Sequence, residues 1–257
     1  MRLRPLWLGL LGSAAGACVL DYDGLTGGAL DGSVRGPAQV FISTPAPGFF
    51  VDATEVTCRD YRAFLEDKAG STTGQRPACA WNTSFIPKSW PPADAELDLP
   101  VVQVDWCDAV AYCAWAGKRL CGAATGGSLG WTSVNDPSVD AWYAACSRGG
   151  ALAYPYGDAF ESAACASARA SIAVVKSLAT CEGGYPGLFD LSGNAREWTD
   201  ACDGDTGAQD GCRVRGGGFD DSSSEPGRLA CLARAGDVDA EYRDTQNEWT
   251  GFRCCRP

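Results

Sequence analysis

Cysteine content is the feature that most constrains how this chain can fold. The sequence has 14 cysteines in 257 residues, and an oxidising compartment lets such thiols pair, whereas a reducing one leaves most of them free. No spacing matches a C-x-x-C zinc pattern, so structural disulfides are expected. Cys202 and Cys212 flank a short loop rich in aspartate and glycine, which makes them easy partners. With Cys18 set aside, the odd number that remains allows up to six bridges and leaves one thiol unpaired, unless Cys18 itself pairs or two chains are linked.

The N-terminus has the pattern of an export signal. MRLRPLWLGLLGSAAGACVLDYDG begins with two arginines, continues as an apolar run and ends in small residues before Cys18. We interpret residues 1–17 as a signal peptide of the lipoprotein type, since the run is too short to span a membrane. Cys18, placed as in the lipobox of bacterial lipoproteins, would then carry a lipid and anchor the protein in the cell envelope. The alternative is an ordinary signal peptide with a cysteine near its cleavage site.

Composition favours one main domain behind a linker. Residues 18–37 are polar and rich in glycine, which predicts a flexible tether. The apolar content of 46% is enough for a sizeable core. We therefore expect a single domain over residues 38–257.

Two global properties exclude whole classes of function. The chain has no histidine, which removes Ser-His-Asp and Cys-His catalytic pairs, three-histidine metal centres and the two-histidine iron triad. Its net charge of −11 and pI near 4.5 repel phosphate backbones. Nucleic acid is therefore not an expected partner.

Local signals predict helices in the first half of the domain. Thr57 has the position of an N-cap for a helix that stops at Gly70. An apolar strand is expected over Val101–Val104, followed by a helix capped by Asp105 and ended by Gly117.

A third helix is expected over about residues 138–147. Beyond it, prolines, glycines and short apolar runs are typical of short strands and turns. The chain therefore predicts an α+β architecture, with its helices early and an irregular, strand-poor C-terminal half.

Several segments, taken in order, resemble successive blocks of the formylglycine-generating enzyme family, also called the sulfatase-modifying-factor domain. These are VDATEVT, PVVQVDWCDAVAYCAWAGKRL, WYAACSRGG with YPYGD, GLFDLSGNAREWTDAC, RVRGGGF and GFRCC. The resemblance extends from about residue 38 to the C-terminus. It implies an α+β fold related to C-type lectins, with few regular elements and, in this chain, many disulfides.

The resemblance also raises the question of copper chemistry. Catalytic members are similar in having two cysteines, five positions apart, whose thiolates bind the copper that oxidises a substrate cysteine to formylglycine; two soft thiolates suit Cu(I). By this resemblance Cys231 is the second cysteine and the one candidate catalytic residue, while Pro226 occupies the first position and Gly218 replaces a serine. Copper is therefore not expected. A disulfide, with Cys254 or Cys255 as candidate partner, is the favoured role of Cys231.

The stretch GLFDLSGNAREWTDAC, residues 187–202, is similar to a family block that holds a structural calcium ion. The resemblance implies carboxylate ligands from Asp190 and Glu197, and backbone carbonyl ligands from Gly193 and Ala195. Such a mixture of oxygens is what calcium prefers. The alternative is an ordinary polar turn in which Glu197 is merely solvated.

These observations predict an exported, lipid-anchored, disulfide-braced and calcium-stabilised module that binds a protein or glycan partner without catalysis. The alternative is a divergent formylglycine-generating oxidase that uses Cys231 with another cysteine brought near by the fold. Trp198 is expected in the core, and Arg215 and Arg253 are expected to donate hydrogen bonds to turns.

Overall fold

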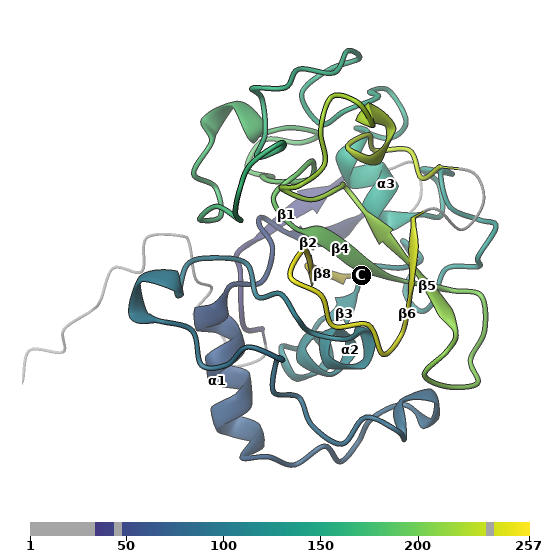
Figure 1. The fold of residues 1–257 in the computed structure, drawn as a ribbon. Helices are drawn as coiled ribbons and strands as arrows, with labels where there is room; N and C mark the ends of the chain where they lie inside the picture. The colour runs from purple at the N-terminus through teal and green to yellow at the C-terminus, as the bar shows by residue number, and fades with distance from the viewer. Residues whose placement is uncertain (1–33, 44–47, 235–238) are drawn as a thin grey trace, which may run out of the picture.

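The computed structural model describes residues 34–43, 48–234 and 239–257 (Figure 1). The predicted signal peptide, Cys18 and most of the predicted tether lie outside the described residues. At the predicted domain boundary the chain is already packed, since the Lys118 ammonium donates to the Pro37 carbonyl at 2.9 Å. None of the helices in the described part of the chain is long and apolar enough to cross a membrane.

Two four-stranded sheets form the frame of the domain. The first is antiparallel with the order β1-β2-β8-β3, and its strands are β1 (Gln39–Ile42), β2 (Phe49–Asp52), β8 (Cys254–Arg256) and β3 (Arg119–Leu120). The second has the order β6-β5-β4-β7, and its strands are β6 (Ala240–Tyr242), β5 (Gly211–Arg215), β4 (Arg196–Cys202) and β7 (Thr250–Phe252). In the second sheet only β4 and β7 run parallel. The pairing of β2 with β8 joins the two ends of the domain (Figure 1).

Both predicted capped helices are confirmed. Helix α1 (Cys58–Lys68) starts after Thr57, whose hydroxyl accepts from the Asp60 N–H at 3.2 Å, and the Asp60 carboxylate in turn accepts from the Thr57 N–H. Helix α2 (Trp106–Trp115) starts after Asp105 with the same reciprocal pattern. These caps satisfy N–H groups that an isolated helix end leaves unpaired, so each helix begins where its sequence signal lies.

The third helix exists but is shorter than predicted. Helix α3 spans Ala141–Cys146 and is capped by the Asp140 carboxylate, which accepts from the Tyr143 N–H at 3.0 Å. Among the described residues the other helical elements are single 3-10 turns, namely Pro77–Cys79, Asp94–Glu96, Ala179–Cys181 and Pro226–Arg228.

Two other expectations are wrong. Val101–Val104 is not a strand: the Val101 N–H bonds the Val56 carbonyl, and Gln103 has a φ of +60°, which breaks an extended run. The segment is apolar because Val101 and Val104 are buried in a loop. The C-terminal half is also richer in strands than predicted, since β4 to β8 all follow residue 195.

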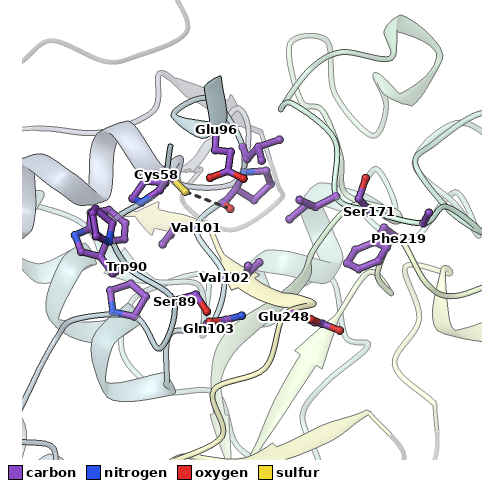
Figure 2. A pocket seen from close by; sticks show the side chains of 17 residues that line it. Cys58, Ser89, Trp90, Glu96, Val101, Val102, Gln103, Ser171, Phe219 and Glu248 are labelled. Atoms are coloured by element: carbon purple, nitrogen blue, oxygen red, sulfur yellow. Dashed lines mark hydrogen bonds between the residues drawn. The ribbon is translucent and has the colours of Figure 1, made fainter. Parts of the chain in front are cut away.

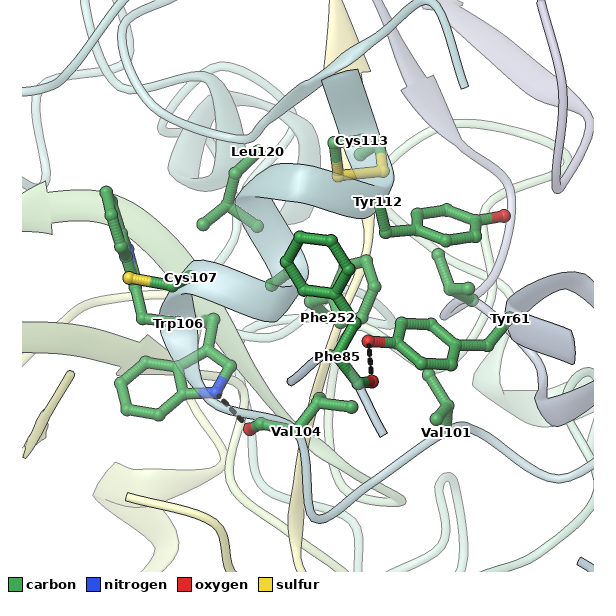
Figure 3. Close-up of a cluster of buried hydrophobic side chains, with 14 of the residues drawn as sticks. Tyr61, Phe85, Val101, Val104, Trp106, Cys107, Tyr112, Cys113, Leu120 and Phe252 are labelled. Atoms are coloured by element: carbon green, nitrogen blue, oxygen red, sulfur yellow. Dashed lines mark hydrogen bonds between the residues drawn. A yellow bond between two sulfur atoms is a disulfide. The ribbon is translucent and has the colours of Figure 1, made fainter. Parts of the chain in front are cut away.

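The larger core cluster packs between α1, α2 and β7. Its centre is aromatic: Tyr61 stacks on Tyr112 with ring centroids 5.6 Å apart, and Phe252 meets Tyr112 edge-on at 5.4 Å (Figure 3). The Tyr61 hydroxyl donates to the Phe85 carbonyl at 2.8 Å, so this buried polar atom has a partner. Trp198 is fully buried in the same cluster, which confirms its predicted place.

Six disulfides brace this irregular frame. They join Cys79 to Cys107, Cys113 to Cys254, Cys121 to Cys255, Cys146 to Cys231, Cys165 to Cys181 and Cys202 to Cys212. The predicted Cys202–Cys212 pair is confirmed. In the described part of the chain Cys58 is the one free thiol. A domain with this many bridges belongs to an oxidising, extracellular or secreted environment.

Candidate functional site

The segment from Asp190 to Ala195 is a tight turn against the second sheet. Asp190, Gly193 and Asn194 all have positive φ, at 60°, 74° and 61°. A Cβ on Gly193 would lie 2.4 Å from the Ala166 carbonyl oxygen, so glycine is required there by space as well as by conformation. The turn brings Asp190 and the backbone at Ala195 to one buried corner.

Glu197, at the start of β4, is already fully engaged. The Arg253 guanidinium donates to both of its carboxylate oxygens, with distances of 2.7 and 2.8 Å, and the Trp142 indole donates to Oε2 at 2.8 Å. A carboxylate has about four acceptor positions, and these four hydrogen bonds use them. Of the predicted calcium ligands, Glu197 is therefore the one whose surroundings favour an ion pair instead.

Glu55 is a carboxylate in this corner that the sequence analysis missed. Its Oε1 accepts from the Asn194 side-chain amide at 3.0 Å and from the Ala195 N–H at 3.4 Å. Its Oε2 is buried and has no hydrogen-bond partner among the described residues. Glu55 and Asn194 are 139 positions apart, so no local pattern signals that they meet.

The electrostatics of the corner show an excess of negative charge. Burial raises the pKa of Glu55 well above its usual range, and the neighbouring Asp190 and Glu197 charges raise it further, against the opposing effect of Arg253. Burial also raises the pKa of Asp190 to about 6, although the Lys176 N–H donates to this carboxylate at 2.6 Å. A cation between Asp190 and Glu55 would relieve both effects.

The donors present fit calcium. Asp190 and Glu55 offer carboxylate oxygens, and the carbonyls of Gly193 and Ala195 belong to the same turn, so the set is all oxygen, as calcium requires. Within the described ranges no group of three histidine, cysteine, aspartate or glutamate side chains is arranged around a metal position. The fit therefore depends on two carboxylates with backbone carbonyls, and on the unpartnered Glu55 Oε2.

Cys231 lies in a disulfide, as favoured from the sequence, but its partner is Cys146 in α3. The suggested partners were wrong, because Cys254 and Cys255 bond to Cys113 and Cys121. Arg215 donates to the Cys231 carbonyl at 2.6 Å, and Arg253 donates to the Phe189 carbonyl at 2.8 Å, so the structural role predicted for these two arginines is confirmed. A disulfide sulfur has no thiolate to offer a metal.

The segment before Cys231 is held by ion pairs. The Arg196 guanidinium donates to Asp221 at 3.1 Å and also to Asp220, and the Gly218 N–H donates to Asp221 at 2.8 Å. Pro226 begins a 3-10 turn, and its carbonyl accepts from the Tyr154 hydroxyl at 3.3 Å. Where the resemblance implies a metal-binding thiolate pair, this chain has carboxylate–guanidinium contacts.

A cavity of about 580 Å³ opens beside this segment (Figure 2). Cys58 lies in its wall, and its thiol faces the Pro100 carbonyl at 3.8 Å. Burial, with a contribution from Glu96, raises the pKa of Cys58 to about 12. The thiol is therefore protonated at neutral pH and is neither a nucleophile nor a ready metal ligand.

The rest of the lining suits a ligand with an apolar body. Trp90, Ile172 and Phe219 contribute apolar wall, and several prolines surround them, while the carboxylates of Glu96 and Glu248 also line the cavity (Figure 2). The lining includes no lysine or arginine. The size and composition of this pocket suit an apolar group that also donates hydrogen bonds or carries positive charge.

Comparisons with known proteins agree with this geometry. The family model of the sulfatase-modifying factor enzyme 1-like domain matches residues 26–257. The chain therefore belongs to the sulfatase-modifying-factor, or formylglycine-generating enzyme, family. It is 28% identical over 271 residues to the mouse inactive C-alpha-formylglycine-generating enzyme 2, covering 86% of this chain and 78% of that protein. It is 32% identical over 117 residues to bovine formylglycine-generating enzyme, but over only 40% of this chain and 27% of that protein.

Solved structures support the fold. CarF superposes with a TM-score of 0.54 at 22% identity, covering 84% of this chain and 88% of that chain. PvdO from Pseudomonas aeruginosa gives a TM-score of 0.52 at 18% identity, covering 85% and 91%. Variable protein 1 of Treponema denticola gives 0.52 at 17% identity, covering 91% of each chain. At such identities the likeness extends to the α+β fold alone.

Proposed function

We propose that this chain is a non-catalytic binding module of the sulfatase-modifying-factor family. The observation that supports this most is the Cys146–Cys231 disulfide, because it removes the one cysteine that the family resemblance offered to copper. Pro226 provides no side-chain ligand at the other position. A relative that covers 86% of this chain is itself named inactive.

The cavity beside Phe219 is the proposed ligand site. Its apolar wall and its two carboxylates favour a protein or glycan partner that inserts an apolar group together with hydrogen-bond donors. Nucleic acid remains excluded from the proposal, because a net charge of −11 opposes a polyanion.

Export, a lipid on Cys18 and a structural calcium ion complete the proposal. Lipidation would tether the domain to a cell-envelope membrane through residues 18–37, and the disulfides suit the oxidising side of that membrane. Calcium held by Asp190, Glu55 and the turn carbonyls would neutralise the buried negative corner. The residues of this chain then keep the turn closed, and the ion performs no chemistry.

A copper and peptide assay tests the central part of the proposal. The purified domain, with its disulfides intact, is incubated with Cu(I), oxygen and a C-x-P-x-R peptide, and the peptide is analysed by mass spectrometry for the aldehyde. We expect no tight copper binding and no aldehyde. Tight Cu(I) binding with conversion of the peptide would contradict the proposal and favour a divergent formylglycine-generating oxidase.

The oxidase alternative requires two reduced thiols near one another. In the part of the chain that the structure describes, Cys58 is the one free thiol, and its pKa of about 12 keeps it protonated. A Cys58→Ala variant tests the oxidase alternative directly. An oxidase that used this thiol would lose its conversion of the peptide, whereas a binding module would keep its melting temperature and its ligand affinity.

A further inference from the structure

A second groove lies along the outer face of α1, separate from the cavity beside Phe219. It has a volume of about 470 Å³ and is formed by α1 and the loop that follows Asn82; its lining is Arg62, Leu65, Glu66, Lys68, Gly70, Ser84, Phe85, Ile86 and Trp90. Trp90 lines both spaces. The groove shares no other residue with the first cavity, so it can be tested independently.

Two cations in this groove have no anionic partner. Arg62 and Lys68 form neither a side-chain hydrogen bond nor an ion pair with any described residue; Lys68 lies 6.0 Å from the ring of Phe64. Arg59, on the same helix, pairs with Asp98 at 3.0 Å. Unpaired, half-buried cations are unusual in a chain of net charge −11, where carboxylates are abundant.

The floor between these cations is apolar. Leu65 and Trp90 are half-buried and Phe85 is buried, while Ile86 has 55% of its surface exposed at the edge of the groove. Large exposed aliphatic side chains next to a hollow are typical of ligand grooves. Glu66 is the only carboxylate in the lining, so the local charge is positive by one unit.

We propose that this groove binds a small monoanionic ligand, a carboxylate with an aromatic or aliphatic body. The apolar body would cover Ile86 and Trp90, and the carboxylate would accept hydrogen bonds from Arg62 and Lys68. A polyanion does not fit, because the chain as a whole repels it and the groove supplies a net charge of only about one unit. The volume matches a free ligand of small-molecule size.

The test uses 2-naphthoate as the probe and 2-naphthylmethylammonium as its charge-reversed counterpart, titrated calorimetrically into the intact protein. We expect naphthoate to bind, and we expect any binding of the cation to persist in variants of the groove, because the carboxylates of the first cavity suit a cation. The Arg62→Gln and Lys68→Gln double variant should lose about tenfold or more in affinity, as expected for charge-assisted hydrogen bonds. Lys88→Gln removes an exposed cation on the same loop that does not line the groove, and it should leave the affinity unchanged.

A second control separates the groove from the first cavity. Glu248→Gln changes a residue that lines only the first cavity, so naphthoate affinity should stay within about twofold. Melting temperatures of all variants confirm that each is folded. The proposal fails if naphthoate does not bind, if the double variant weakens the binding of the cation as much as that of naphthoate, or if the double variant binds naphthoate as the unmodified protein does.

Discussion

Glu55→Gln is the sharpest test of the proposed calcium site at Asp190 and Glu55. The amide keeps the shape of the side chain and its acceptor for Asn194, but removes the negative charge at the unpartnered Oε2. If Glu55 is a ligand, calcium at about a hundredfold over its dissociation constant stabilises the unmodified protein by about 2.7 kcal/mol. For a domain of this size, that corresponds to a rise in melting temperature of roughly 5–10 °C. The variant should lose most of this rise.

The same substitution should have the opposite effect without calcium. In chelator, the unmodified protein keeps the Glu55 carboxyl buried beside the Asp190 and Glu197 charges, which oppose its ionisation, and the neutral amide does not meet this repulsion. Glu55→Gln should therefore be at least as stable as the unmodified protein in chelator and less stable in calcium. Differential scanning calorimetry in the two buffers measures both stabilities. The matched control is Glu248→Gln, since Glu248 is exposed and forms no side-chain hydrogen bond or ion pair with any described residue.

Two results would refute this reasoning. If the melting temperature of the unmodified protein does not respond to calcium, the protein has no stabilising calcium site. If calcium raises the melting temperature of Glu55→Gln as much as that of the unmodified protein, Glu55 is not a calcium ligand. Glu197 is a poorer probe, because its loss removes the ion-pair partner of the buried Arg253, at a cost of about 3–5 kcal/mol whether or not calcium binds.

Three further predictions concern the frame. Burial raises the pKa of Asp105 to about 7 from an ordinary 3.8, so between these pH values the folded protein binds a proton that the unfolded chain does not. The free energy of unfolding should therefore fall as the pH rises from 3.8 to about 7. Asp105→Asn, which still caps α2, should make the free energy of unfolding from urea melts depend less on pH over this range. Replacing Cys146 and Cys231 together by serine opens a cross-link between residues 85 apart and should cost about 4.5 kcal/mol in denaturant unfolding; a loss under about 1 kcal/mol would contradict the link. Gly193→Ala should destabilise by more than about 2 kcal/mol, through left-handed strain and the contact with Ala166, and a neutral change in melting temperature would mean that the turn differs.

The features that the sequence predicted well are local ones. Thr57 and Asp105 cap their helices because each helix start depends on a few neighbouring residues, and the Cys202–Cys212 bridge closes a short loop. Trp198 could be placed in the core because large apolar side chains seldom stay exposed.

Long-range pairing could not be inferred in the same way. The partner of Cys231 depends on how α3 packs, and an apolar run such as Val101–Val104 has the same composition in a buried loop as in a strand. Glu55 was missed for a related reason: it precedes α1, and only the folded chain brings it to the turn at Asn194. The resemblance to the family identified the block that contributes Asp190 to the proposed calcium site, but it did not identify Glu55.

Peptide mapping of the native protein without reduction tests the central claim most directly. Digestion after alkylation of free thiols in denaturant should yield a peptide pair linked through Cys146 and Cys231, with Cys58 carrying the alkyl group. That result would show that no thiolate at Cys231 is available for copper. Recovery of Cys231 as an alkylated thiol, with Cys146 free or bonded elsewhere, would contradict the account and favour a divergent formylglycine-generating oxidase.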